Sequence, residues 1–136
     1  IRHDLYGMPE APRFCFLPEV CEQLLEVPIT TVAFGARKMP CGGGGYFRLF
    51  PYAYSRWALR HVNRRDRQSA VFYFHPWEID PAQPVQRNLG LKTRVRHYLN
   101  LHRTEQRLRR LATDFRWSRM DAIFLSARDE VDGAHA

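Results

Sequence analysis

A group of chemically capable side chains directly follows a short apolar run of this sequence. The group comprises His75, Trp77, Glu78 and Asp80. Residues 71–74 before it are β-branched or aromatic and too few for a helix, which predicts a buried strand. Pro76 cannot donate to a strand ladder and restricts His75 to an extended or turn conformation. The strand is therefore expected to end at His75.

This position gives His75 two possible roles. In α/β architectures, catalytic side chains lie at the carboxyl ends of the strands, where the loops form a crevice. His75 would then be a general acid or base. Alternatively, His75 hydrogen-bonds a neighbouring loop and Trp77 packs against the end of the core. The sequence position alone favours neither role.

The block from residue 72 to residue 80, Phe-Tyr-Phe-His-Pro-Trp-Glu-Ile-Asp, resembles the closing motif of the NodB-type polysaccharide deacetylases, carbohydrate esterase family 4. It is most similar to a bacterial subgroup found with exopolysaccharide and exosortase loci, which carries a C-terminal extension. Further blocks agree, in the same order along the chain. They are residues 1–9, 26–31, 43–49 and 96–105. The resemblance covers roughly residues 1 to 124.

The resemblance implies a fold and a missing partner. The family fold is a distorted (β/α) barrel whose metal site lies in its N-terminal half, on Thr-Phe-Asp-Asp and His-x-x-x-His motifs. Neither motif occurs in this sequence. We therefore expect an α/β chain over residues 1–126, the C-terminal portion of a deacetylase barrel plus a helical extension. Residues 127–136 are expected to be a disordered tail. The missing N-terminal half of the barrel is an expected partner.

The resemblance also implies a reaction, the hydrolysis of N-acetyl groups from hexosamines in a polysaccharide. In the family a divalent metal, expected to be zinc, activates water, an Asp acts as base and a His protonates the departing amine. Only the last role transfers to this chain, and it falls on His75. No metal ligand is assigned, so the chain by itself is expected to be inactive. The expected substrate contacts are Trp77, Tyr46, Arg48, Glu78 and Asp80, although packing or surface ion pairing would explain each of them equally well.

The net charge of +7 raises the question of a polyanionic partner. Basic residues concentrate within 56–67 and 92–110. Residues 51–65 are predicted to form a helix with Tyr54, Trp57, Ala58, Leu59 and Val62 facing inward. Residues 103–116 are predicted to form another, with Thr104 as N-cap and an apolar stripe of Leu108, Leu111, Ala112 and Phe115. The arginines would then be the solvated faces of these helices.

Three functional classes stay open: part of a deacetylase, a non-catalytic carbohydrate-binding or scaffold remnant, and a basic nucleic-acid-binding module. No helix-turn-helix, zinc-finger or RNP pattern accompanies the arginines, so no nucleic acid is expected. No apolar run is long enough to span a membrane, and a cytoplasmic location is expected.

The rest of the chain gives weaker signals. Residues 24–34 are predicted to form a strand, and residues 35–45 a loop. The glycines at 42–45 suit either close approach of another segment or plain flexibility. Residues 91–101 are ambiguous, and residues 119–125 favour a short helix or strand. The odd cysteine count argues against a disulfide framework, which makes the thiols of Cys15, Cys21 and Cys41 buried or incidental.

Overall fold

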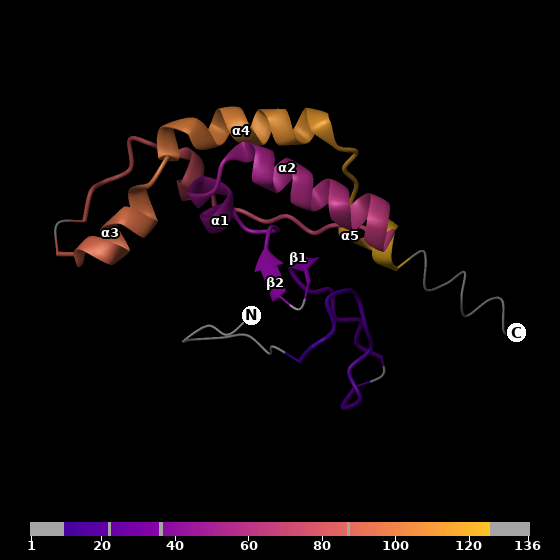
Figure 1. The fold of residues 1–136 in the computed structure, drawn as a ribbon. Coiled ribbons are helices and arrows are strands. Elements are labelled where there is room, and N and C mark those ends of the chain that lie inside the picture. The colour runs from indigo at the N-terminus through magenta and orange to yellow at the C-terminus, as the bar shows by residue number, and fades with distance from the viewer. Residues whose placement is uncertain (1–9, 22, 36, 87, 126–136) are drawn as a thin grey trace, which may run out of the picture.

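The computed structural model describes residues 10–21, 23–35, 37–86 and 88–125. These residues form a small sheet, short helices and two longer helices (Figure 1). In chain order the elements are β1 (Thr31–Phe34), β2 (Arg37–Pro40), α1 (Gly44–Leu49), α2 (Tyr52–His61), the π-helix η1 (Val62–Asp66), the 3-10 helix η2 (Pro76–Ile79), α3 (Leu91–Tyr98), α4 (Leu101–Asp114) and α5 (Met120–Phe124).

The sheet is a two-stranded antiparallel hairpin. β1 and β2 pair from Thr31 opposite Pro40 to Phe34 opposite Arg37. Gly35 follows β1 with a φ of 57°, a conformation that glycine adopts without steric cost. The predicted strand over residues 24–34 was therefore too long, and β2 lies in the predicted loop. β2 was not predicted because it begins with the polar residues Arg37 and Lys38 and so lacks an apolar strand pattern. Both side chains are exposed on the hairpin.

The predicted core strand over residues 71–74 is wrong. This segment is extended, but among the described residues it makes a single parallel bridge, between Tyr73 and Gly43. The Tyr73 N–H donates to the Gly42 carbonyl and the Gly44 N–H donates to the Tyr73 carbonyl, each at 2.9 Å. Pairing stops there because the partner segment turns into α1. Tyr73 and Phe74 are consequently 40% and 42% exposed.

Gly42, one of the glycines in the predicted loop, lies where two backbone segments approach each other closely, so flexibility alone does not explain it. A Cβ at Gly42 would lie 2.4 Å from the Val71 carbonyl oxygen and 2.9 Å from the Thr30 nitrogen. A side chain at this position would therefore separate the extended segment from the end of the hairpin.

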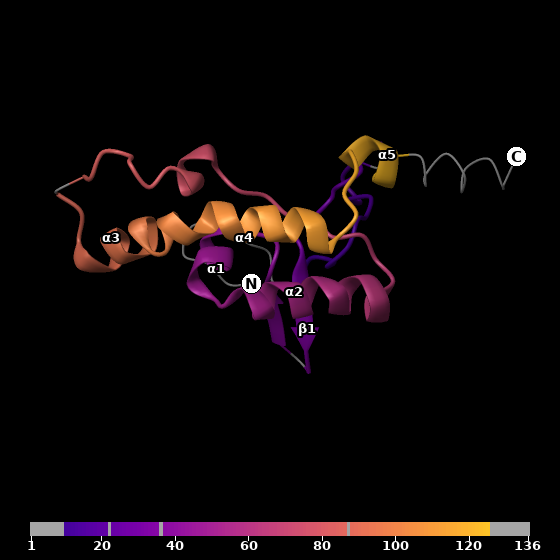
Figure 2. The same cartoon turned by 90° about the horizontal axis from the view of Figure 1, so that it is seen from above.

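The core lies between the hairpin, α2 and α4. α4 runs along α1 and α2, while α3 and α5 lie at opposite ends of the molecule in both views (Figures 1 and 2). Buried apolar side chains from these elements form one cluster. It comprises Val32, Cys41, Phe47, Ala58, Leu59, Val62 and Leu111, with Phe72 packed against it.

The predicted helix over residues 51–65 is confirmed as α2 continued by η1. Ala58, Leu59 and Val62 are buried as predicted, and Tyr54 is half-buried with its hydroxyl donating to the Pro40 carbonyl at 3.0 Å. The inward position predicted for Trp57 is wrong, since this side chain is 41% exposed.

The second predicted helix begins earlier than expected, because α4 starts at Leu101. Thr104 is therefore not an N-cap. It is fully buried inside the first turn, where its hydroxyl donates to the Asn100 carbonyl at 3.0 Å. Asn100 occupies the N-cap position with a φ of 57°. Leu111 is buried, Leu108 and Phe115 are half-buried, and Ala112 is exposed.

The described residues mix helices with a small sheet, an α/β type of architecture, and contain no barrel. The ambiguous segment 91–101 contains α3, and the predicted short element near residue 120 is α5. The predicted tail, residues 127–136, lies outside the described residues. No helix within the described ranges has the length and apolar character that a membrane span requires.

Candidate functional site

His75 lies where the extended segment meets η2. Its backbone N–H donates to Glu78 Oε2 at 2.9 Å, and the Glu78 N–H donates back to the His75 carbonyl at 2.9 Å. These two hydrogen bonds satisfy donors at the start of η2, much as a capping box does at an α-helix. Pro76 begins the turn, where a missing N–H costs nothing. The backbone of His75 is thus fixed, while its side chain stays exposed.

Glu78 is buried and paired with Arg48 of α1. Glu78 Oε1 lies 3.1 Å from Arg48 Nε, and the two side chains are 2% and 3% exposed. Arg48 Nη1 also donates to the carbonyls of His97, at 2.8 Å, and Leu99, at 3.2 Å. In return, Asn100 Nδ2 donates to the Arg48 carbonyl at 2.7 Å. This network ties η2, α1 and the junction between α3 and α4 into one unit.

An aromatic stack covers the same unit. The Trp77 ring is nearly parallel to the imidazoles of His75 and His97, with interplanar angles of 9° and 14°. The ring centroids are 5.9 Å and 4.3 Å apart, respectively. The Arg48 guanidinium carbon lies 5.1 Å from the Trp77 ring centroid, within cation–π range. We call the set His75, Trp77, Glu78, Arg48 and His97 the η2 cluster.

Arg107 supports the cluster from α4. Its Nη1 donates to the carbonyls of Phe47, Arg48 and Phe50, at 3.1, 3.3 and 3.2 Å. A cation at this end of α1 complements the helix dipole. Burial lowers the pKa of Arg107 from its ordinary value, with the nearby Arg103 charge acting in the same direction. Arg107 is therefore not part of the solvated face predicted for this stretch, because it holds α1 in place.

The structure brings four of the six predicted site residues together, in the η2 cluster. Tyr46 lies on α1 with its ring stacked on Phe50, at a centroid distance of 6.1 Å, and is 37% exposed. Asp80 is exposed, and its Oδ1 accepts the Ala82 N–H at 3.0 Å in the turn after η2. Direct contact of Arg48 and Glu78 with a substrate stays a prediction that their burial disfavours. The geometry gives both a positioning role.

The sequence reasoning missed His97. It lies in the segment that was ambiguous, and nothing in its local pattern connects it with Trp77. The one available signal was its place inside the resembling block 96–105. His97 Nε2 lies 3.2 Å from Gln83 Oε1, which connects the stack to the loop after η2.

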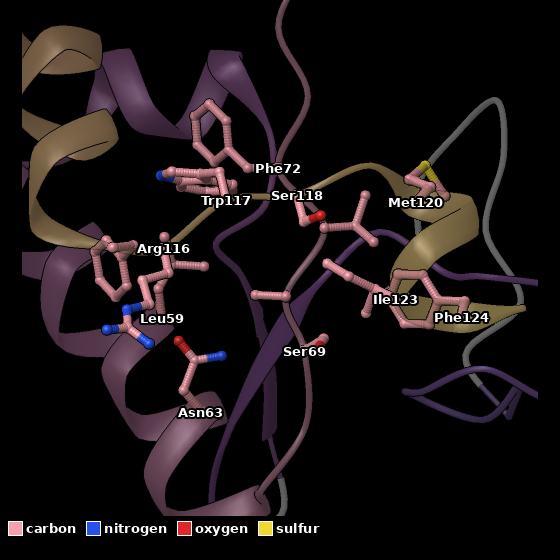
Figure 3. Close-up of a pocket in the computed structure, with 13 residues that line it drawn as sticks. Leu59, Asn63, Ser69, Phe72, Arg116, Trp117, Ser118, Met120, Ile123 and Phe124 are labelled. Carbon is pink, nitrogen blue, oxygen red and sulfur yellow. The ribbon is translucent and has the colours of Figure 1, made fainter. Parts of the chain in front are cut away.

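A separate hollow of about 150 Å³ lies between the end of α2, the extended segment and α5 (Figure 3). Its lining is mixed, with Leu59, Phe72 and Phe124 beside Asn63 and Ser118. None of the predicted site residues lines it.

No metal site is assigned from this chain. Within the described ranges, no three His, Cys, Asp or Glu side chains gather into a group that could hold a metal ion. The η2 cluster offers one exposed imidazole, a fixed backbone and a buried carboxylate already paired with arginine. The cluster can position the His75 imidazole as a proton donor. The buried carboxylate of Glu78 is already paired with Arg48 and is not placed to bind a metal ion.

The chain belongs to a family described as a domain of unknown function, DUF3473, whose model matches residues 1–125. No curated protein and no solved structure matches the chain. Family membership therefore covers the whole η2 cluster without assigning an activity to it.

Proposed function

We propose that this chain provides the acid-bearing part of a metal-dependent polysaccharide N-deacetylase, with His75 as the general acid. The observation that carries the proposal is the setting of His75, an exposed imidazole on a backbone fixed by buried Glu78. The resemblance of several ordered blocks to the NodB-type deacetylases supplies the reaction class. Hydrolysis of an amide needs a proton for the departing amine nitrogen, and a positioned histidine is the usual donor.

The residues around His75 fit this task. Its ring is stacked parallel to Trp77, which limits the directions in which the imidazole can point. Trp77 is half-buried, so its remaining accessible surface could pack against the apolar face of a pyranose. Glu78 fixes the backbone of His75, and the Arg48 charge keeps that carboxylate paired in a buried position.

The barrel is likewise a proposal, and two observations support it. The Tyr73–Gly43 bridge is parallel, the pairing type of (β/α) barrels. The extended segment that ends at His75 exposes Tyr73 and Phe74, and α1 exposes Leu49. Exposed large apolar side chains at the end of a bridged segment suit contact with a further part of the fold. We propose that the N-terminal half of the barrel covers these side chains and provides the metal ligands.

We assign the metal to that N-terminal half because the resemblance to the NodB-type deacetylases places the metal-ligand motifs there. When bound, the metal would supply activation of water. The contribution of this chain is to bind the sugar beside Trp77, to orient His75, and to deliver a proton from its imidazole to the amine.

The test uses the full-length protein that contains these residues. His75→Ala should lower turnover on an acetylated chitooligosaccharide by roughly 10²–10⁴, the usual range for one general acid. Metal content and the melting temperature should stay unchanged. His102→Ala, at an exposed histidine of α4, is the matched control and should retain full turnover. Near-normal turnover in His75→Ala would refute the assignment of His75 as the general acid.

A non-catalytic glycan-binding role is the second candidate, favoured by the half-buried Trp77 stack. It predicts that His75→Ala leaves chitooligosaccharide binding intact and that no variant of the full-length protein releases acetate. Measuring acetate release and binding on the same samples separates the two candidates.

A further inference from the structure

A groove lined by arginines runs along the outer side of α2. Its volume is about 500 Å³. The charged and aromatic residues that matter here are Arg56, Arg60, Arg64, Arg65, Arg110 and Trp57. Among the residues that the structure describes, no carboxylate lines the groove. The groove shares no residue with the η2 cluster, so the inference does not rest on the proposed function.

The arginines form a regular row. Arg56, Arg60 and Arg64 recur every four residues, which places them one above the other on the same side of the helix. At 1.5 Å of rise per residue, Arg56 and Arg60 are about 6 Å apart along the axis of α2. Like charges at this spacing destabilise an isolated helix. Arg64 also lies in η1, and π-helical turns are rare and often found at functional sites.

Neighbouring acids leave most of this charge uncompensated. Asp114 Oδ2 lies 2.9 Å from Arg56 Nε, and Asp66 is paired with Arg13 at 2.8 Å. In the described part of the chain, Arg60, Arg64 and Arg65 form no ion pair. The groove is therefore a concave surface with at least three guanidinium groups available to an anion.

Trp57 indicates which kind of anion fits. It is 41% exposed beside the arginine row, and its indole can pack on the apolar face of a sugar ring while guanidinium forks bind carboxylates. Single-stranded nucleic acid is usually held by several aromatic faces, one for each stacked base. Of the other two rings that line the groove, Tyr52 is covered by the Arg110 guanidinium at 4.8 Å, and the His61 imidazole packs against Trp57 at a centroid distance of 5.5 Å. One available aromatic face among arginines suits a carboxylate-bearing glycan better.

We propose that the groove along α2 binds an anionic glycan, with Arg60 and Arg64 contacting carboxylates and Trp57 contacting a sugar ring. The test is calorimetric titration of the full chain at several salt concentrations. Three probes of equal length are compared: a hexuronic acid oligosaccharide, a neutral N-acetylglucosamine oligosaccharide, and single-stranded DNA.

The hexuronic acid oligosaccharide should bind in a salt-dependent manner, and the neutral probe should bind at least about tenfold more weakly, since it offers no charge to the guanidinium groups. Arg60→Gln/Arg64→Gln should weaken binding about tenfold or more and make it less sensitive to salt, because two charge contacts are lost. Trp57→Ala should weaken binding without changing the salt dependence, and Trp57→Tyr should restore most of the affinity. Circular dichroism confirms that each variant is folded.

Arg94→Gln/Arg96→Gln is the matched control, because it removes the same charge from exposed positions of α3. It should leave affinity within about twofold of the parent, as rim charges away from a site act only at long range. An equal loss in both double variants would show general charge attraction and overturn the proposal. Tighter binding of DNA, unaffected by Trp57→Ala, would overturn it in favour of a nucleic-acid surface. Absence of hexuronate binding would also overturn it.

Discussion

Glu78 occupies the space that a side chain at Gly44 would need. A Cβ built on Gly44 would lie 2.0 Å from Glu78 Oε2 and 2.7 Å from the carboxyl carbon. The carboxylate can therefore reach both Arg48 and the His75 N–H only because residue 44 has no side chain. A glycine at the start of α1 thus determines the geometry of a loop more than thirty residues further along the chain.

Gly44→Ala should displace Glu78 and break its buried pair with Arg48. Loss of a buried ion-pair partner costs about 3 kcal/mol of unfolding free energy, measurable by urea denaturation. Gly45→Ala is the matched control, since a Cβ there meets nothing within 4 Å and the position is helical. That variant should be neutral or stabilised by up to about 1 kcal/mol. Equal stability of the two variants would contradict the steric argument.

The Arg48–Glu78 pair should matter far more than an exposed pair of the same chemistry. Glu78→Gln leaves Arg48 buried without a compensating charge and should cost about 3 kcal/mol of unfolding free energy. Glu105→Gln, whose partner Arg109 lies 2.8 Å away on the exposed side of α4, should cost less than about 0.5 kcal/mol. Chemical denaturation of both variants provides the comparison. Similar costs would mean that burial does not set the strength of the Arg48–Glu78 pair.

The parts of the fold that were predictable from sequence are those determined by local periodicity. The apolar spacing of Ala58, Leu59 and Val62 identified α2, and that of Leu108 and Leu111 identified α4. The prediction of a buried strand over residues 71–74 was wrong. Its β-branched and aromatic residues suit such a strand, but within the described residues the segment forms only the bridge between Tyr73 and Gly43. Strand pairing depends on distant partners, and no local pattern specifies them.

The candidate site was predictable only in part for the same reason. His75, Trp77 and Glu78 are neighbours in sequence, so their proximity followed from the motif. The pairing of Glu78 with Arg48 and the stacking of His97 on Trp77 are contacts between distant segments. They depend on how α1 and α3 pack, which residue types and local spacing do not encode.

Among the three cysteines, Cys41 should react most slowly with a thiol reagent. It is 2% exposed, its Sγ donates to the Thr30 carbonyl at 3.4 Å, and burial raises its pKa from 9.0 to about 12. Only the thiolate reacts, so at pH 8 its reactive fraction is about a thousandfold below that of an ordinary thiol. Cys15 and Cys21 are exposed. A disulfide-exchange reagent should modify two thiols quickly and the third only after unfolding in urea.

The variant Cys15→Ser/Cys21→Ser isolates Cys41 and should show no fast phase at all. Fast modification of this variant in the folded state would mean that the thiol is accessible, contrary to its burial in the core.

Asp114 should make stability sensitive to acid. The Tyr52 hydroxyl donates to Asp114 Oδ2 at 2.7 Å, and this hydrogen bond, together with the charges of Arg56, Arg110 and Arg60, lowers the pKa of Asp114 below 3.8. A depressed pKa in the folded state means that the stabilisation is complete above the unfolded value and is lost as the pH falls through the folded value. The unfolding free energy should therefore decrease below about pH 4.

Asp114→Asn removes this titration, so its unfolding free energy should vary less between about pH 5 and pH 3 than that of the parent. Asp121→Asn changes the net charge equally at an exposed position of α5 and should keep the acid dependence of the parent.

At alkaline pH, Tyr52 should make the unfolding free energy decrease as the pH rises. Burial, reinforced by Asp114, raises the pKa of Tyr52 from 10.0 to about 12, so the unfolded chain loses that proton first. Stability should fall between pH 10 and pH 12, less so in Tyr52→Phe, and equal alkaline slopes for parent and variant would contradict the assignment.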